Sequence, residues 1–444
     1  MILHAYAKVN LLLDVIGRRE DGYHELEGIM QSVSLYDELC LRPSEGITVE
    51  CDTPLPENNT CKKAAEAFLG KDGPGCAIKL VKRIPSEAGL GGASADAAAV
   101  LRGLNHIYRG TSLERSEEEL YALGLKVGAD VPFCLMGGCA VARGVGERLT
   151  PVPAPILPLL IVRGSTGVST AKLFASLGVG REKKSRLKEG ALEKALCALE
   201  KGDIAGLAPN LENALQEAAS RSVPEIGVYA ERMLRAGALG ACMTGSGAAV
   251  FGVFSSFDEA KNAESAFADC DFKAAVRALP SPAPVCVRIR KADIMDAPLT
   301  ARLRKEAWLT TYRGIYRDEL LDGFDIKART ERDRKRLEDP SQYGFIIEAD
   351  GRPCGFIFLR KQGGMHIDAL YLLKEYRGFG IGRDAFGFFR ELCREEGRSR
   401  FTCCCNAHNL KALAFYGRMG GRITAKTLGH DDPREDQISL EFDA

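Results

Sequence analysis

The sequence has 444 residues, of which 45% are hydrophobic and 27% are charged; this is a globular composition that excludes collagen-like and wholly disordered chains. Lysine and arginine together number 60, as do aspartate and glutamate, so the net charge of +0 excludes a general basic attraction to nucleic acid or anionic lipid. At roughly 150 residues per domain, the length predicts three folding units, or two if one is large.

The cysteines and the first residues indicate the compartment. An odd number of cysteines, 15, without regular spacing argues against a disulfide framework and favours free thiols. The start MILHAYAKVNLLLDV lacks the features of a secretory signal. The uncharged stretch 236–257 is long enough to span a bilayer, but its TGSG turn favours two buried strands around a glycine loop. We therefore expect a cytoplasmic protein with no membrane or nucleic-acid partner.

The chain divides into two parts at a proline-rich segment. Before it, we predict strands over 4–15, 76–84, 248–254 and 272–276, and helices over 93–107, 117–127 and 224–236. This order is no regular strand–helix alternation, so it favours the α+β class. The segment ALPSPAPV at 278–285 predicts an extended linker. A strand at 285–289 and a charged helix at 328–338 follow, which gives domains at 1–278 and 286–444 and a linker at 279–285.

The most informative segment is IPSEAGLGGASADAA at 84–98, where a glycine-rich loop joins a strand to an alanine-rich helix. Glycines let the backbone approach a ligand, and the free amides at a helix start attract an anion. We expect Ser94 to cap this helix and to offer its hydroxyl to a phosphate or its metal ion. The spacing matches neither the dinucleotide nor the Walker motif. A purely structural glycine turn is the alternative.

Two further polar segments accompany this loop. Lys8 and Asn10 lie two residues apart on a predicted strand, so their side chains share a face. Lys8 is flanked by apolar residues and needs a counter-charge if it is buried. The segment GADVP places Asp130 at a predicted helix-to-strand corner. A lone lysine or aspartate is more typical of a solvated surface.

Taken together, AKVNLLLDVIGRREDGYHEL, PSEAGLGGASADAAAVLRGLN, GADVPFCLMGG and CMTGSGAAVFGVF resemble the GHMP superfamily of small-molecule kinases over nearly all of 1–278. The resemblance is to the branch that serves the non-mevalonate isoprenoid pathway. It implies a two-lobed fold and ATP-dependent phosphorylation of the 2-hydroxyl of 4-(cytidine 5'-diphospho)-2-C-methyl-D-erythritol. A kinase for another small alcohol is the alternative, against which Tyr23, His24 and Phe174 argue.

The same resemblance assigns catalytic and ATP-binding residues. Asp130 is the general base, and Lys8 orients its carboxylate and the hydroxyl; phosphoryl transfer needs such positioning more than covalent help. The implied cofactor is ATP with Mg²⁺, whose ligands include phosphate oxygens and the Ser94 hydroxyl. The expected ATP-binding residues are Pro85, Ser86, Glu87, Ala88, Gly89, Leu90, Gly91, Gly92, Ala93, Ser94, Ala95 and Asp96.

The resemblance also assigns the substrate site. His24 can hydrogen-bond a base edge, and the Tyr23 and Phe174 rings can pack on the base; a plain hairpin histidine is the alternative for His24. Met30 replaces an aromatic residue of many relatives and gives less stacking, and Ala93 replaces a loop glycine. The expected substrate-binding residues are Asn10, Tyr23, His24, Met30, Phe174, Thr244, Gly245, Ser246 and Gly247.

In the second part, RGFGIG at 377–382, AWLTTYRGI at 307–315 and NAHNLKALAFYGRMG at 406–420 resemble the GNAT N-acetyltransferases over most of 286–444. This implies a separate α/β domain with a central mixed sheet and acetyl-CoA as cofactor, its pyrophosphate held on loop amides. Tyr416 is the implied general acid that protonates the leaving thiolate. The expected acetyl-CoA contacts are Leu370, Tyr371, Leu372, Arg377, Gly378, Phe379, Gly380, Ile381, Gly382 and Asn409.

The acetyltransfer base and the acceptor stay open. His366 or Asp368, on a strand where many relatives carry glutamate, could activate an amine through water, or both are plain surface residues. A second hypothesis makes this domain a non-catalytic module that senses acetyl-CoA or joins subunits. We expect small molecules as the substrates of both domains, and the sequence predicts no acetyl acceptor and no oligomeric state.

Overall fold

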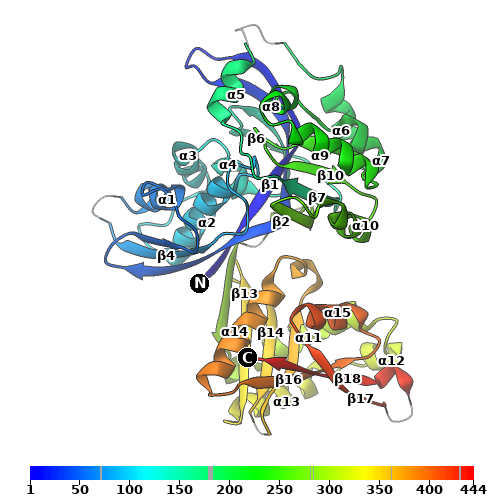
Figure 1. Cartoon of the computed structure of the whole chain (residues 1–444). Helices are drawn as coiled ribbons and strands as arrows, with labels where there is room; N and C mark the ends of the chain where they lie inside the picture. Colours follow the sequence, from blue (N-terminus) through cyan, green and yellow to red (C-terminus); the bar gives the residue numbers. More distant parts are fainter. Residues whose placement is uncertain (71–72, 179–183, 281, 284, 362, 430–431) are drawn as a thin grey trace. The chain divides into compact units, whose positions relative to one another are not determined.

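The computed structural model describes residues 1–70, 73–178, 184–280, 282–283, 285–361, 363–429 and 432–444 (Figure 1). They form two compact units, unit 1 (Met1–Cys286) and unit 2 (Val287–Ala444). The N–H groups of Ala278 and Leu279 donate to carbonyl oxygens of Leu157 and Ser32, so both residues are fastened to unit 1. Residues 281 and 284 of the predicted linker lie outside the described residues, and the limits of this linker stay a prediction.

Two long antiparallel strands, β1 (Ile2–Arg18) and β2 (His24–Ser44), run through both lobes of unit 1 (Figure 1). Most of β1 is buried, because the rest of the unit covers both of its faces. Four strands extend this sheet next to β2: β3 (Thr48–Cys51), β4 (Gly75–Val81), β5 (Cys139–Gly144) and β6 (Arg148–Pro151). The short β8 (Glu212–Asn213) pairs with β1.

Each lobe of unit 1 has its own helices: one lobe contains β4, and the other contains a second sheet. That sheet has the order β11 (Phe272–Arg277), β7 (Pro158–Arg163), β10 (Val250–Val253) and β9 (Gly240–Met243). The lobe with β4 carries α1 (Thr60–Leu69), α2 (Gly92–Ile107), α3 (Glu117–Val127) and α4 (Val131–Met136). The other lobe carries α5 (Thr170–Ser176), α6 (Ala191–Lys201), α7 (Ile204–Leu207), α8 (Gln216–Ser222), α9 (Glu225–Arg235) and α10 (Phe257–Ala263), with the 3₁₀ turns Ala208–Asn210 and Glu264–Phe267.

Unit 2 is one mixed sheet with helices on it. The strand order is β17 (Arg422–Thr427), β18 (Gln437–Asp443), β16 (Arg400–Asn406), β15 (Met365–Leu372), β14 (Arg352–Arg360), β13 (Gln342–Ala349) and β12 (Cys286–Lys291). Among the strand pairs that the structure describes in unit 2, only β15 and β16 are parallel. The helices are α11 (Ala297–Tyr312), α12 (Asp318–Asp322), α13 (Ile326–Glu338), α14 (Ile381–Glu395) and α15 (Leu410–Arg418), with the 3₁₀ turns Ile294–Asp296, Lys374–Tyr376 and Pro433–Glu435.

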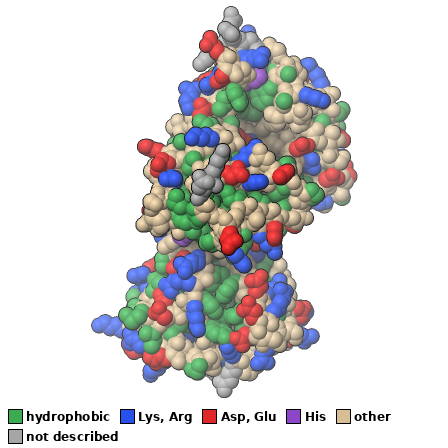
Figure 2. All heavy atoms as spheres, turned by 90° about the vertical axis from the view of Figure 1, so that its left-hand side faces the viewer, with side chains coloured by type: hydrophobic (Ala, Val, Ile, Leu, Met, Phe, Trp, Pro, Cys, Tyr) green, Lys and Arg blue, Asp and Glu red, His purple; other side chains and the backbone are tan. Residues whose placement is uncertain are grey.

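The predicted class is confirmed: a two-lobed α+β unit precedes a separate α/β unit with a mixed sheet. The uncharged stretch 236–257 forms β9, a glycine turn and β10, as expected. Within the parts of the chain that the structure describes, no helix combines the length and hydrophobicity needed to cross a bilayer. The balanced charge is visible on the face drawn in Figure 2, where basic and acidic side chains are interspersed.

Candidate active site

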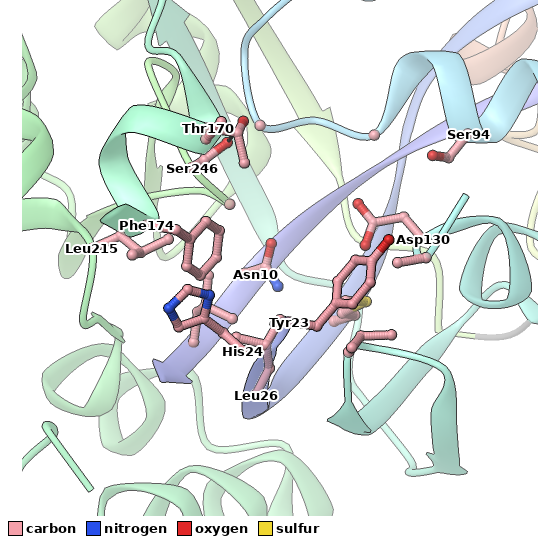
Figure 3. Close-up of a pocket in the computed structure, with 18 of the residues that line it drawn as sticks. Asn10, Tyr23, His24, Leu26, Ser94, Asp130, Thr170, Phe174, Leu215 and Ser246 are labelled. Carbon is pink, nitrogen blue, oxygen red and sulfur yellow. Dashed lines mark hydrogen bonds between the residues drawn. The ribbon is translucent and has the colours of Figure 1, made fainter. Parts of the chain in front are cut away.

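A cavity of about 880 Å³ in unit 1 brings together most of the separate motifs of its sequence (Figure 3). Its lining comes from β1, the start of β2, the glycine loop, the corner between α3 and α4, and α5. The predicted site residues that line it are Lys8, Asn10, Tyr23, His24, Met30, Gly89, Gly91, Ser94, Asp130, Phe174, Gly245 and Ser246. The glycine loop and Asp130 thus open onto the same cavity.

The Lys8 ammonium joins two of these residues. Its side chain is 4% exposed, and its Nζ donates a hydrogen bond of 2.6 Å to Asn10 Oδ1 and lies 3.5 Å from Asp130 Oδ2. A buried ammonium needs such partners because removing a charge from water is costly. The Asp130 side chain is 31% exposed and lines the cavity, so this carboxylate lies beside a cation and can still meet a ligand.

The glycine loop presents bare backbone to the cavity. Gly89 and Gly91 adopt φ angles of 71° and 69°, in the left-handed region that favours glycine. A Cβ atom at Gly89 would lie 2.1 Å from the carbonyl oxygen of Thr244, and one at Gly91 would lie 3.0 Å from Cγ of Lys8. Side chains are therefore excluded at both places, which suits the close approach of a phosphate-bearing ligand.

The prediction that Ser94 caps the helix is wrong. Helix α2 begins at Gly92, and its N-cap is Gly91, without a side-chain cap. The positive φ of Gly91 turns the chain into the helix before Ser94 is reached, so Ser94 is the third helical residue and its hydroxyl is not needed as a cap. Its side chain lines the cavity.

The expected strand after Asp130 is also wrong. Asp130 is the N-cap residue of the short helix α4. Pro132 lies in the first turn of this helix, where its lack of an N–H costs no hydrogen bond, because N–H groups there have no partner within the helix. The Asp130 side chain makes no cap hydrogen bond. The carboxylate is therefore available to the cavity rather than used by the helix.

The remaining loop residues do not line this cavity. Ala88, Leu90 and Ala95 are buried in the cores of unit 1, and Asp96 is 3% exposed and bound to Lys82. The loop residues without cavity contact are Pro85, Ser86, Glu87, Ala88, Leu90, Gly92, Ala93, Ala95 and Asp96. Their predicted contribution to ATP binding stays a prediction.

An aromatic wall forms the other end of the cavity. The rings of His24 and Phe174 are 4.8 Å apart between centroids, and Tyr23 reaches from the β1–β2 turn toward Asp130 (Figure 3). Burial, and next the nearby Arg18 charge, lower the pKa of His24 and favour the neutral imidazole. A neutral imidazole offers both a donor and an acceptor, so this end suits a flat, polar ring.

The residues of the TGSG turn lie in two different environments. Thr244 is fully buried; its Oγ1 accepts the N–H of Asn10 at 3.0 Å and donates to the carbonyl oxygen of Gly89 at 3.3 Å. Thr244 therefore ties β1 to the glycine loop, and neither Thr244 nor Gly247 lines the cavity. Gly245 and Ser246 do line it, and the Ser246 hydroxyl lies 2.7 Å from that of Thr170.

Several cavity residues were not predicted. Thr170 lies one helical turn before Phe174 in α5, and this spacing could have identified it, because residues four apart share a helix face. Arg18, Leu26, Val145 and Leu215 also line the cavity. Three of these are apolar, and no sequence pattern separates apolar cavity residues from core residues.

In unit 2 the predicted acetyl-CoA segment lies where two parallel strands separate. β15 and β16 pair only through Met365–Ile367 and Phe401–Cys403, although they continue to Leu372 and Asn406. Within the described parts of these strands, Leu370, Tyr371 and Leu372 have no ladder partner on β16. Backbone groups without a strand partner are open to a ligand that adds its own hydrogen bonds.

The loop after β15 is fixed by Arg377. Its Nε donates to the carbonyl oxygen of Leu372 at 2.9 Å, and its Nη2 donates to Thr311 Oγ1 on α11 at 2.9 Å. Gly378 and Gly380 have φ angles of 92° and 85°, and Gly380 is the N-cap of the long helix α14. A helix start behind a glycine turn suits a pyrophosphate.

The two predicted residues near α15 have separate surroundings. Asn409 caps this helix by accepting the N–H of Ala412 at 3.2 Å. Tyr416 is 8% exposed and packs near Phe386 and Phe442. Burial raises the pKa of Tyr416 well above its ordinary value, so its hydroxyl keeps its proton at neutral pH.

The two candidate bases on β15 also differ. Asp368 is an extra residue in the ladder with β14 and lies 3.4 Å from each of Arg336 and Arg360, which neutralise it. His366 accepts from or donates to Thr402 Oγ1 at 2.7 Å, and burial lowers its pKa. A neutral imidazole can take a proton, so the geometry favours His366 over Asp368 as a base.

Comparison with known proteins shows that unit 1 is similar to small-molecule kinases. Residues 59–138 match the GHMP kinases N terminal domain, and residues 193–272 match the GHMP kinases C terminal family. A 4-diphosphocytidyl-2-C-methyl-D-erythritol kinase of Acetivibrio thermocellus is 44% identical over 259 residues, 57% of this chain and 89% of that protein. One of Alkaliphilus metalliredigens is 41% identical over 270 residues, 59% of this chain and 90% of that protein.

Solved structures and the family of unit 2 complete this comparison. A crystal structure of 4-(cytidine 5'-diphospho)-2C-methyl-D-erythritol kinase is 37% identical, with a TM-score of 0.53, and the match covers 63% of this chain and 99% of that chain. Residues 306–421 match the Acetyltransferase (GNAT) family.

Proposed function

Since the chain belongs to the 4-diphosphocytidyl-2-C-methyl-D-erythritol kinase family, we propose that unit 1 transfers the γ-phosphoryl group of ATP to the 2-hydroxyl of 4-(cytidine 5'-diphospho)-2-C-methyl-D-erythritol. One observation supports this most: the glycine loop, Asp130 and the His24–Phe174 wall share one cavity. Such a cavity suits a substrate with a nucleobase at one end and a reacting hydroxyl at the other.

The roles that we propose at the reacting end follow from charge. Asp130 accepts the proton of the 2-hydroxyl as this oxygen attacks, and Lys8, 3.5 Å away, holds the Asp130 carboxylate and the hydroxyl in place. Bound ATP would supply the phosphoryl group, and the Mg²⁺ that accompanies it would neutralise the charge of the phosphates. The bare amides near Gly89 and Gly91 hold phosphate oxygens, and Ser94 is the candidate to meet the metal ion.

At the other end, His24 and Phe174 hold the cytosine ring. Phe174 stacks on the ring, and the neutral His24 imidazole hydrogen-bonds its edge. Met30 is the remaining proposed contact of the base, whereas Tyr23, at 64% exposure, reaches from the β1–β2 turn toward Asp130 and so toward the reacting end (Figure 3). This proposal explains why an aromatic wall lies in the same cavity as a catalytic carboxylate.

A comparison of three alcohols as acceptors tests the kinase proposal. The purified full chain is given ATP, Mg²⁺ and three alcohols in turn: the cytidine substrate, 2-C-methyl-D-erythritol 4-phosphate, which lacks cytidine, and homoserine. ADP release is measured for each. We expect the highest kcat/KM for the cytidine substrate, with the new phosphate on its 2-hydroxyl. A higher kcat/KM for an alcohol without cytidine would contradict the proposal.

For unit 2 we propose an acetyl-CoA-dependent N-acetyltransferase, consistent with its GNAT family match. Two features support a cofactor site for one long ligand: the end of β15 that extends beyond its pairing with β16, and the glycine turn, anchored by Arg377, that leads into α14. We propose that Tyr416 protonates the leaving thiolate; burial raises the pKa of its hydroxyl, which therefore still carries its proton at neutral pH. His366 takes the proton of the acceptor amine through water.

An assay with a panel of amines and radiolabelled acetyl-CoA tests this second activity. Wild type is compared with Tyr416→Phe, which keeps the buried ring and removes only the hydroxyl. We expect turnover with at least one amine and a clear loss of kcat in the variant. Tight acetyl-CoA binding without turnover of any amine would instead favour the non-catalytic sensing module.

A further inference from the structure

A buried carboxylate on β2 holds the entry to the glycine loop. Asp37 is fully buried; its Oδ1 accepts the N–H groups of Arg83 at 2.5 Å and Ile84 at 2.8 Å, and its Oδ2 accepts from Lys82 Nζ at 2.5 Å. These three residues directly precede Pro85. One side chain from a distant strand therefore fixes the backbone at the point where the chain enters the loop.

The same lysine reaches the exit of the loop. Lys82 Nζ donates a second hydrogen bond, of 2.7 Å, to Asp96 Oδ2 on α2. The Lys82 side chain is only 11% exposed, and a Cβ atom on Gly92 would lie 3.4 Å from its ammonium, so Lys82 lies directly against the start of α2. The ion pairs join β2, the loop entry and α2 into one group.

The middle of the loop is bound to the catalytic strand. The N–H of Lys8 donates to the carbonyl oxygen of Leu90 at 2.9 Å. A shift of either end of the loop would therefore move Gly89 and Gly91 and would disturb Lys8 as well. Displacements of this kind matter, since an error of about 1 Å far from the reacting atoms can reduce a rate roughly 100-fold.

The charges of this group are unequal. Two carboxylates share one ammonium, and burial together with the charge of Asp37 raises the pKa of Asp96 to about 7. The neighbouring helices α1 and α4 contribute the buried thiols of Cys61 and Cys134 to this environment. Asp96 therefore stays largely neutral below this pH, and Lys82 with Asp37 then forms a balanced pair.

We propose that Asp37, Lys82 and Asp96 form a clamp that fixes the two ends of the glycine loop and so positions its amides for the nucleotide phosphates. The proposal rests on the proposed ATP-dependent activity, but it concerns ATP binding and not the alcohol acceptor. Asp37 and Lys82 are positioning residues: fully buried Asp37 acts on the nucleotide only through the loop.

ATP affinity of the full chain, measured by calorimetry without acceptor, tests the clamp. Lys82→Met keeps the length of the side chain and removes its charge, and we expect a dissociation constant roughly 10- to 100-fold higher. Asp37→Asn can keep one oxygen for the two backbone N–H groups, but its NH2 group then faces the Lys82 ammonium, donor against donor, and we expect an increase of similar size. Lys82→Arg keeps the charge and two-sided donor capacity, so it recovers most of the affinity. The matched control is Lys79→Met, at an exposed position on β4.

The result that would overturn the clamp is weak ATP binding in Lys82→Met together with normal binding in Asp37→Asn, because Lys82 would then act on the nucleotide itself. Normal binding in both variants would overturn it as well. If Lys82→Met does not fold, the comparison of Asp37→Asn with Lys82→Arg decides: lost affinity in the first and near-normal affinity in the second support the clamp, and normal affinity in the first contradicts it. If the wild-type chain binds ATP but does not phosphorylate the cytidine substrate, the proposed acceptor is contradicted and the clamp is not.

Discussion

Lys8 Nζ lies 3.5 Å from Asp130 Oδ2 although the two residues are far apart in the chain, one on β1 and one at the start of α4. The same ammonium donates to Asn10 Oδ1. In the proposed reaction this charge lies beside the attacking hydroxyl and the carboxylate that takes its proton.

Lys8→Met therefore tests the charge while it keeps the length of the side chain. We expect kcat for phosphorylation to fall by roughly 10²–10³-fold, as for the loss of one electrostatic donor in an active site. The thermal midpoint and ATP affinity serve as controls for folding. Wild-type kcat in this variant would show that Lys8 has no role in the reaction.

Gly89→Ala tests the bare backbone of the loop. Gly89 has a φ of 71° and Gly110 a φ of 75°, so a side chain at either position costs roughly 1–2 kcal/mol of backbone strain. Of these two positions, only Gly89 would bring the new Cβ into collision with a backbone oxygen. We expect Gly89→Ala to weaken ATP binding at least tenfold, whereas Gly110→Ala loses stability alone. Equal ATP affinities in the two variants, measured by calorimetry, would argue against a phosphate site here.

Phe174→Ala tests the cytidine end. Loss of a stacked ring costs about 1–3 kcal/mol, so KM for the cytidine substrate rises by roughly 5- to 150-fold while KM for ATP stays unchanged. Steady-state kinetics with each substrate varied in turn distinguish the two. An equal rise in both KM values would mean that Phe174 supports the fold of the whole cavity and not the base.

The raised pKa of Asp96 predicts a pH dependence of stability. Between its ordinary value of 3.8 and about 7, the folded chain holds a proton that the unfolded chain has released. The contribution of Asp96 is therefore complete below the lower value, falls as the pH rises to about 7, and is then constant. Urea unfolding of wild type and Asp96→Asn between about pH 5 and 8 measures it. The stability of wild type relative to the variant is expected to decrease with pH, and an increase would contradict the assignment.

The helices and strands predicted from local patterns are present, but the predictions left out others, among them the long strand β2 (His24–Ser44), and they missed the long-range pairings. The helix over 117–127 was predicted with its observed ends, and the structure shows that Ser116 and Glu119 form a capping box at its start. The motif around Asp130 was recognised, yet the following helix was read as a strand, since six residues with one proline carry little helical period.

The clamp illustrates the limit of sequence reasoning more clearly. Lys82 and Asp96 flank the glycine loop, but Asp37 comes from another strand, and no spacing in the sequence connects it with them. Likewise, Thr244 was expected to meet the substrate, and only its hydrogen bonds to Asn10 and Gly89 reveal a connecting role. Side-chain contacts between distant segments depend on packing, which local patterns do not encode.

The most direct test of the account is the Asp130→Asn variant of the full chain, assayed with ATP, Mg²⁺ and the cytidine substrate. Asparagine keeps the shape of the side chain but cannot accept the hydroxyl proton as a carboxylate does. We predict a loss of roughly 10²–10⁴-fold in kcat with unchanged ATP affinity. A variant that phosphorylates the 2-hydroxyl at the wild-type rate would contradict the central assignment of this cavity.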